Sequence, residues 1–236
     1  MARGDADATG RMALMAEAIS RNGADTRRQN MVDSQLRTCE VTNQALLAAF
    51  ANLPRENFVA PAFAALAYLD RDIPALGARD RLLLAPMTLA RLIQAANTQP
   101  GERVLDVAGG SGYSAAIMAS LGARVVALES DAGAVAAARR LLASEPAIEI
   151  VAGGLAAGAA GGPFDVIVVN GAFDGAPEKL LSLLAEGGRL VGVDASYSAP
   201  KAILVERISG QTSRRPLFDV TAPRLEAFRK APSFAF

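Results

Sequence analysis

The sequence predicts an α/β fold with a mostly parallel central sheet and helices on both of its faces. Apolar segments with strand character alternate with helix-compatible segments between residues 100 and 195, the order that builds parallel strands joined by crossover helices. Hydrophobic residues make up 51% of the 236-residue chain, enough to bury the core of a large domain. A strand, a glycine-rich turn, a helix and a second strand follow one another from Val104 to Glu129, as in nucleotide-binding α/β proteins.

The chain divides into a tail and one domain. Residues 1–30 are rich in Ala, Arg, Asp, Asn and Gly, and their apolar patch, Met12–Ile19, is too short for a secretory signal, so we expect a flexible N-terminal tail. Residues 31–236 form the domain. We assign 31–99 to a helical N-terminal part, 100–195 to the nucleotide-binding core and 196–236 to C-terminal strands.

The N-terminal part is predicted to be helical. Apolar residues recur at helical spacing from Met31 to Leu53, with Thr42 as the expected N-cap between two helices. A further helix begins at Pro86, since proline fits the first turn of a helix. Its apolar residues share one face: Leu89, Leu92, Ile93 and Ala96.

The core continues the alternation of helices and strands. After Glu129 we expect a helix over 132–144, a strand over 148–151, a strand over 165–169, a helix over 177–184 and a strand over 189–193. Residues 202–218 alternate well enough for two antiparallel strands, and Leu225–Phe228 are expected to close an edge.

The glycine turn is suited to a ligand. Gly109, Gly110 and Gly112 follow a strand that ends in Asp106. Since glycine has no Cβ, a ligand can lie against the backbone and face the free N–H groups of the next helix. Glu129 follows Gly112 by 17 residues (129 minus 112), where an acid can accept hydrogen bonds from both hydroxyls of a ribose. The alternative is a tight strand-to-helix turn without a ligand.

Composition excludes several function classes. Lysine and arginine together number 24, as do aspartate and glutamate, which gives no electrostatic reason to expect nucleic acid or an anionic membrane as a partner. The chain has no histidine, so imidazole bases and histidine-containing metal sites are absent, and we expect no metal. The lone Cys39 fits a reducing cytoplasm. The oligomeric state stays open.

Several separated motifs resemble the protein-L-isoaspartate O-methyltransferase family, in the same order along the chain. They are Met31-Val32, Gln35-Leu36-Arg37, Val41-Thr42, Leu53-Pro54-Arg55, Phe58-Val59-Ala60-Pro61, Ala67-Tyr68-Leu69-Asp70 and Ile73-Pro74. With the glycine turn, the resemblance extends from Met31 to about Phe228. It implies a Rossmann-like methyltransferase fold with S-adenosyl-L-methionine as cofactor.

The resemblance also implies the cofactor-binding residues. The spacing of the turn is not that of the dinucleotide-binding Gly-x-Gly-x-x-Gly motif, and it comes closer to the methyltransferase pattern Asp-x-Gly-x-Gly-x-Gly, with Ala108 at the first glycine position. We expect Ala108 to be tolerated because alanine adopts many conformations with negative φ. The expected cofactor-binding residues are Asp106, Ala108, Gly109, Gly110, Ser111, Gly112, Tyr113, Glu129, Ser130, Gly153, Gly154 and Asn170.

The substrate loop departs from the family pattern. The family loop resembles Gly-x-Thr-Ile-Ser-x-Pro, and counting back from Pro86 places the three leucines Leu82–Leu84 at its Thr-Ile-Ser positions. Leu84 stands at the serine that helps to hold the substrate carboxylate, and leucine donates no side-chain hydrogen bond. Arg79 or Arg81 is an alternative source of compensating charge, unless both are simply solvated.

The segment expected to bind the adenine of the cofactor also departs from the family pattern. Where the family has Gly-Asp-Gly after the third core strand, this chain has Ala152-Gly153-Gly154, so the side-chain acceptor for the adenine amino group is missing. Asn170 stands at the end of the fourth strand. It either faces the substrate or is a turn asparagine satisfied by the protein itself.

These features predict an S-adenosylmethionine-dependent O-methyltransferase that methylates carboxylates of isomerised aspartate in damaged proteins or peptides. No catalytic side chain is identified. The alternatives are a divergent relative that binds the cofactor but uses another acceptor, or an inactive binding module. The three leucines favour these alternatives because an apolar loop suits an apolar ligand or a partner surface.

Overall fold

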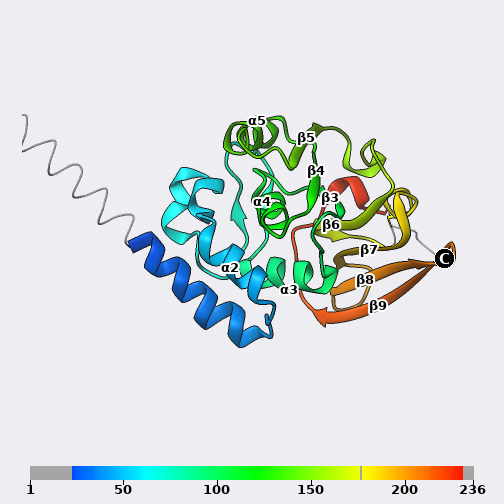
Figure 1. Ribbon diagram of the computed structural model, residues 1–236, viewed down its shortest axis with the longest axis horizontal. Helices are drawn as coiled ribbons and strands as arrows, with labels where there is room; N and C mark the ends of the chain where they lie inside the picture. Colours follow the sequence, from blue (N-terminus) through cyan, green and yellow to red (C-terminus); the bar gives the residue numbers. More distant parts are fainter. Residues whose placement is uncertain (1–22, 176, 231–236) are drawn as a thin grey trace, which may run out of the picture.

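The computed structural model describes residues 23–175 and 177–230. A seven-stranded sheet with the order β5-β4-β3-β6-β7-β8-β9 runs through the molecule in Figure 1. Its strands are β3 (Arg103–Val107), β4 (Arg124–Glu129), β5 (Ile148–Ala152), β6 (Phe164–Phe173), β7 (Leu184–Asp194), β8 (Lys201–Ile208) and β9 (Gln211–Asp219). Strands β3 to β7 pair in parallel and β8 and β9 are antiparallel, which confirms the predicted fold class.

Helices and short turns surround this sheet. The α-helices are α2 (Gln44–Asn52), α3 (Pro86–Ala96), α4 (Tyr113–Ser120), α5 (Ala132–Leu141) and α6 (Glu178–Leu181). The shorter helical elements are η1 (Val32–Leu36), η2 (Arg37–Cys39), η3 (Arg55–Phe58), η4 (Pro61–Leu66), η5 (Leu155–Ala157) and η6 (Glu226–Phe228). A two-stranded ribbon, β1 (Ile73–Pro74) with β2 (Leu82–Leu83), precedes α3.

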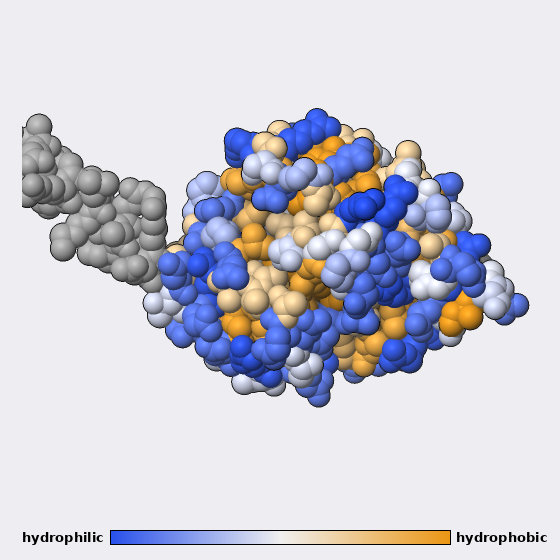
Figure 2. Space-filling model, viewed as in Figure 1, coloured by the Kyte–Doolittle hydropathy of each residue, from blue (hydrophilic) through white to orange (hydrophobic). Residues whose placement is uncertain are grey.

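The two faces of the sheet carry separate apolar cores. Alternating residues of one strand point to opposite faces, so Val104 packs in one core and its neighbour Leu105 in the other. On the first face lie the N-terminal helices, α3 and α4, and α3 buries the predicted stripe from Leu89 to Ala96. On the second face lie α6 and the turn η5, through Leu180 and Leu155. Figure 2 shows hydrophobic residues over the middle of the viewed surface, surrounded by hydrophilic ones.

The N-terminal part is helical, with one change in its capping. Asn43, not the expected Thr42, caps α2, because its side chain accepts a hydrogen bond from Leu46 N. The expected tail lies mainly outside the described residues. Its last part is helical over residues 23–31, and Arg28 donates to the backbone oxygen of Ala51.

The core follows the predicted order with four differences in extent. Helix α5 ends at Leu141 instead of residue 144. Strand β6 continues through Asn170 to Phe173. Helix α6 has only four residues, and β7 begins at Leu184, with the Gly187–Gly188 pair inside an irregular stretch. Leu225–Phe228 do not close an edge of the sheet, because Leu225 N donates to Ala172 O at the end of β6, in the middle of the sheet.

The C-terminal strands form a tight hairpin. Ile208 pairs with Gln211 across the two turn residues Ser209 and Gly210, and both turn residues have positive φ, 52° and 75°. Such turns match the natural twist of paired strands. Strand β9 is the outer strand of the sheet, and it carries Arg214, Arg215 and Pro216.

Candidate active site

The glycine turn connects β3 to α4 at the carboxyl edge of the sheet, where ligands of such sheets bind. Ala108 has a φ of +61°, so the expectation of a negative φ is wrong. This residue adopts the left-handed conformation that glycine adopts without strain. A Cβ at Gly109 would lie 2.3 Å from Asp106 Oδ2 and 2.6 Å from Ser114 Oγ. The turn is therefore packed directly against the buried side chains beneath it.

Asp106 lies under the turn instead of facing outward. It is fully buried, and its carboxylate accepts hydrogen bonds from Ser114 Oγ at 2.6 Å and from Asn170 Nδ2 at 2.6 Å. Burial raises the pKa of Asp106 to about 6, and the two hydrogen bonds oppose that rise. Asn170 also donates to Val107 O. Its amide nitrogen thus donates two hydrogen bonds within the protein, from a position inside strand β6 instead of the expected turn.

Glu129 lies next to the turn, with only 3% of the residue exposed. Its Oε2 accepts from Gly110 N at 3.0 Å, and its Oε1 accepts from Ser130 N at 2.7 Å and Asp131 N at 3.0 Å. The structure therefore brings together the backbone of Gly110 and the carboxylate of Glu129, two of the expected cofactor-binding groups.

Arg81 occupies the remaining acceptor positions of Glu129. Its Nε lies 3.0 Å from Oε2 and its Nη2 lies 3.0 Å from Oε1, a two-point contact of the strongest kind between these groups. Nη2 also reaches Ser130 Oγ at 3.3 Å. The arginine considered above as a partner for a substrate carboxylate is instead the partner of the expected ribose acceptor.

The space over the glycine turn is filled by the chain itself. A Cβ built on Gly110 would lie 2.9 Å from Ala75 Cβ, 3.2 Å from Arg81 Cγ and 3.2 Å from Leu83 Cδ2. The space between Leu82–Leu84 and Gly109 is also closed, since it leaves no room for a water molecule. The β1–β2 ribbon thus covers the turn in this conformation.

The other expected residues contribute in different ways. The Ser111 hydroxyl donates to Phe58 O, and the buried Tyr113 ring packs edge-on against Phe50 and Phe58. Gly153 N donates to Glu129 O at 3.0 Å, while no atom lies within 4 Å of a Cβ built on Gly154. Ser111 and Tyr113 therefore hold the N-terminal part in place, and Gly154 borders open space.

The leucine loop is part of the core. Leu83 and Leu84 are 4% and 2% exposed, and Leu84 O accepts a hydrogen bond from Arg55 Nη2 at 2.8 Å. Arg55 is fully buried, and its Nε donates to Ala67 O at 2.9 Å. Burial lowers the pKa of the Arg55 guanidinium. The sequence marked Arg55 only as part of the Leu53-Pro54-Arg55 motif, and nothing in its local pattern identified it as the clamp that fixes the loop.

A polar cavity of about 320 Å³ lies beside Arg81. Its lining includes Ser130, which follows Glu129, and Leu155, which follows β5. Since β5 lies next to β4 in the sheet, the cavity continues the line from the glycine turn through Glu129 to the next strand end. The C-terminal residues Arg224 and Glu226 border it as well.

The donor and acceptor types at this edge suit an adenosyl cofactor, because the acid Glu129, the backbone of Gly110 and the neighbouring cavity lie in one row. Their present arrangement leaves no room for this cofactor, because Arg81 occupies the carboxylate of Glu129 and Leu83 packs over the glycine turn. A ribose at Glu129 requires that the Arg81 side chain leave.

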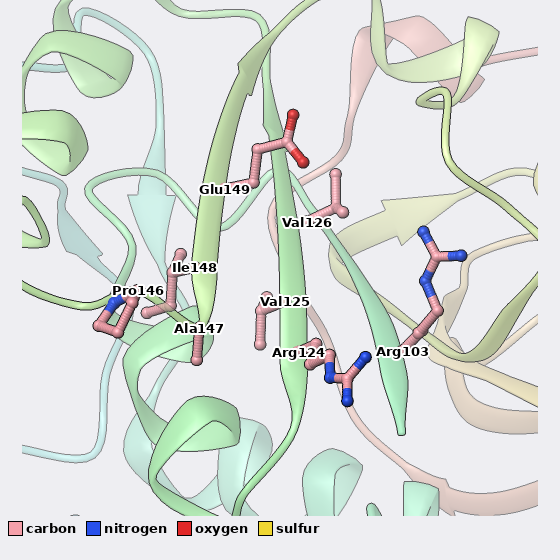
Figure 3. A pocket seen from close by; sticks show the side chains of 8 residues that line it. All are labelled: Arg103, Arg124, Val125, Val126, Pro146, Ala147, Ile148 and Glu149. Atoms are coloured by element: carbon pink, nitrogen blue, oxygen red, sulfur yellow. The ribbon is translucent and has the colours of Figure 1, made fainter. Parts of the chain in front are cut away.

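A separate cavity lies at the opposite edge of the sheet. Arg103 and Arg124 are paired at the starts of β3 and β4, and with Glu149 they line a cavity of about 360 Å³, shown in Figure 3. The connection between β5 and β6 contains the three-residue turn η5, without a longer helix that could cover the sheet beside this cavity. This cavity lies at the amino ends of the strands, away from Glu129.

Residues 23–175 and 177–230 contain neither a candidate metal site nor a helix that could span a membrane. No group of three or more Cys, Asp or Glu side chains there is arranged to hold a metal ion. Within the same ranges, every helix is too short or too polar to cross a membrane.

Comparison with known proteins agrees with the motifs. Residues 26–218 match the model of the family described as protein-L-isoaspartate(D-aspartate) O-methyltransferase. A protein-L-isoaspartate O-methyltransferase of Methylorubrum populi is 42% identical over 169 residues, which cover 71% of this chain and 79% of that protein. One from Koribacter versatilis is 34% identical over 209 residues, which cover 87% of this chain and 93% of that protein.

Solved structures share the fold. A protein-L-isoaspartate O-methyltransferase structure superposes with a TM-score of 0.73 at 23% identity, covering 86% of this chain and 67% of that one. A Plasmodium falciparum structure, described as a protein-L-isoaspartate O-methyltransferase beta-aspartate methyltransferase in complex with S-adenosyl-L-homocysteine, superposes with a TM-score of 0.72 at 21% identity, covering 85% of this chain and 98% of that one. The chain therefore belongs to the protein-L-isoaspartate(D-aspartate) O-methyltransferase family, a family of S-adenosylmethionine-dependent methyltransferases.

Proposed function

We propose that this protein transfers a methyl group from S-adenosyl-L-methionine to a carboxylate of isomerised aspartate in proteins or peptides, in the cytoplasm. The observation that carries the proposal is the contact of Gly110 N with Glu129 Oε2 at the carboxyl edge of the sheet, in a chain that matches the family over residues 26–218. Relatives with this family's name extend over most of the chain.

The reaction suits a site without histidine. A carboxylate is already a nucleophile and the cofactor's sulfonium supplies a good leaving group, so no strong base is needed. Alignment of reactants and exclusion of water then account for the catalysis, effects worth up to about 7–11 kcal/mol in intramolecular models. In this protein Glu129 and Gly110 would hold the ribose side of the site. The buried loop at Leu83 and Leu84 would exclude water from it.

The experiment is transfer of a labelled methyl group from the cofactor to a synthetic isoaspartyl peptide. The matched control is the same peptide with ordinary aspartate. Transfer to the first peptide alone supports the proposal. No transfer at high enzyme concentration, with the cofactor shown to bind, would rule out the isoaspartyl substrate and leave a methyltransferase with another acceptor.

A second candidate function is that of a binding module that has kept the fold and lost the cofactor. It is favoured by one observation, the filled hollow over Gly110, where Arg81 and Leu83 lie at contact distance. Isothermal titration calorimetry with S-adenosyl-L-methionine and S-adenosyl-L-homocysteine separates the two functions. Heat of binding for either ligand argues for the enzyme, and the absence of binding by a folded protein argues for the module.

A further inference from the structure

We infer that Arg81 is an internal competitor of the cofactor, and that it sets the affinity of this site by occupying the carboxylate of Glu129. The inference rests on the proposed function, because it concerns the same site. It assigns to Arg81 a role that the glycine turn and the sheet edge do not by themselves imply.

Glu129 has no acceptor position left for a ligand. A carboxylate has about four lone-pair positions. Oε1 is within hydrogen-bond distance of Ser130 N, Asp131 N and Arg81 Nη2, and Oε2 of Gly110 N and Arg81 Nε. The backbone donors belong to the turn and to the strand end itself. Two of the donors to Glu129 are side chains, Arg81 and the Ser130 hydroxyl, which lies 3.5 Å from Oε1. Arg81 makes the shorter, two-point contact, so it is the one that a pair of ribose hydroxyls can replace.

The contact between Arg81 and Glu129 is buried and little screened by water. The side chains of Arg81 and Glu129 are 14% and 3% exposed, so water screens the pair much less than an ion pair at the surface. A ligand that removes the guanidinium must offset the loss of this contact. Its apparent dissociation constant therefore rises in inverse proportion to the fraction of time that Arg81 leaves the carboxylate free.

The backbone around Arg81 is held in place by its neighbours. The segment before it lies against the start of α5, where a Cβ on Gly133 would lie 1.9 Å from Gly77 O. Arg79 N donates to Asp131 Oδ2 at 2.9 Å, and Ala75 N donates to Arg81 O at 2.9 Å. The guanidinium is thus presented to Glu129 at a high effective concentration, as for any tethered ligand.

The site also offers the displaced side chain a place to go. The cavity of about 320 Å³ beside Arg81 is bordered by the acidic residues Asp80, Asp131 and Glu226. These carboxylates are counter-charges for a guanidinium that leaves Glu129, although Arg224 also borders the cavity. Movement of one side chain is then enough to free the carboxylate of Glu129.

The test is calorimetric titration of S-adenosyl-L-homocysteine into wild-type protein and Arg81→Ala. We expect the variant to bind at least tenfold more tightly. Arg79→Ala is the matched control, because it removes the same charge two residues away from an exposed side chain without a side-chain hydrogen bond among the described residues. Its affinity should equal that of the wild type. Arg81→Met, which keeps the apolar stem of the side chain, replaces Arg81→Ala if the alanine variant does not fold.

A second measurement identifies the competing group. Methylguanidinium added to Arg81→Ala should weaken binding of S-adenosyl-L-homocysteine, whereas sodium chloride at equal ionic strength should weaken it less. Equal affinities for wild type and Arg81→Ala would overturn the inference and leave the proposed function intact. Failure of both proteins to bind would overturn the inference and the proposed function together, and tighter binding by both arginine variants would replace the specific contact with a general effect of charge.

Discussion

Asn170 on β6 donates its side-chain amide to Asp106 on the neighbouring strand β3, with 2.6 Å between Nδ2 and Oδ1. The bond joins two polar groups that are 4% and 0% exposed, directly beneath the glycine turn. A buried carboxylate with neutral partners keeps an elevated pKa, and this has a measurable consequence for stability.

Protein stability should depend on pH through Asp106. Burial raises its pKa from 3.8 to about 6, so between these values the folded state binds a proton that the unfolded state does not. The free energy of unfolding therefore falls as pH rises from about 4 to 6, and is flat above that range as far as this group is concerned.

The measurement is urea unfolding of wild type and Asp106→Asn at pH 4.5 and pH 7.5. Relative to the variant, the wild type should be more stable at pH 4.5 than at pH 7.5 by about 2 kcal/mol. A difference between the two proteins that is the same at both pH values would contradict the assignment.

Gly133→Ala should destabilise the protein by about 2–3 kcal/mol, because overpacking costs this much and the new Cβ would lie 1.9 Å from Gly77 O. Gly154→Ala is the matched control. Its φ is −69° and no atom lies within 4 Å of the new Cβ, so it should be neutral or stabilise the protein by up to about 1 kcal/mol. Thermal unfolding of both variants tests the pair, and equal losses would argue against the packed contact at Gly77.

Leu84→Ser should cost about 2–4 kcal/mol of folding free energy, because Leu84 is 2% exposed and the new hydroxyl would be buried with it. Leu69→Ser, at a leucine that is 49% exposed, should cost little. The Leu84 variant restores the family serine, so a gain of isoaspartyl methylation must be measured on the folded fraction. Unfolding curves for both variants provide that correction, and a Leu84 variant as stable as the Leu69 variant would show that the loop is less buried than described.

Arg55→Ala should destabilise the protein by about 3 kcal/mol or more, because it leaves the buried carbonyls of Ala67 and Leu84 without their donors. Arg140→Ala removes an exposed arginine from α5 and should change stability by less than about 0.5 kcal/mol. Chemical denaturation provides both values. If the Arg55 variant lost no more stability than the Arg140 variant, Arg55 would not be the clamp of the loop.

The fold, and the position of the glycine turn next to Glu129, were predictable from the sequence. The strands β3 and β4 and the turn between them are marked by short-range patterns, namely apolar runs, glycines at fixed positions and an acid at the strand end, Glu129. These patterns act within a few residues of the chain. The same holds for α3, whose start at Pro86 and apolar stripe are local features.

The occupants of the site were not predictable in the same way. Arg81 reaches Glu129 across 48 residues of sequence and Asn170 reaches Asp106 across 64, and no local pattern encodes such contacts. Ala108 shows a different limit, since its φ of +61° is imposed by the turn as a whole. Its own propensity would favour negative φ.

The outer strand β9 has a consequence for the behaviour of the protein at high concentration. An unpaired strand edge is a template onto which another molecule can add a strand. Here Pro216 lacks the N–H group that a pairing strand would need. Arg215 also brings a positive charge to β9, whereas the neighbouring Arg214 is paired with Asp194. The hairpin that completes the sheet thus also opposes the addition of a further strand, and with it polymerisation through this edge.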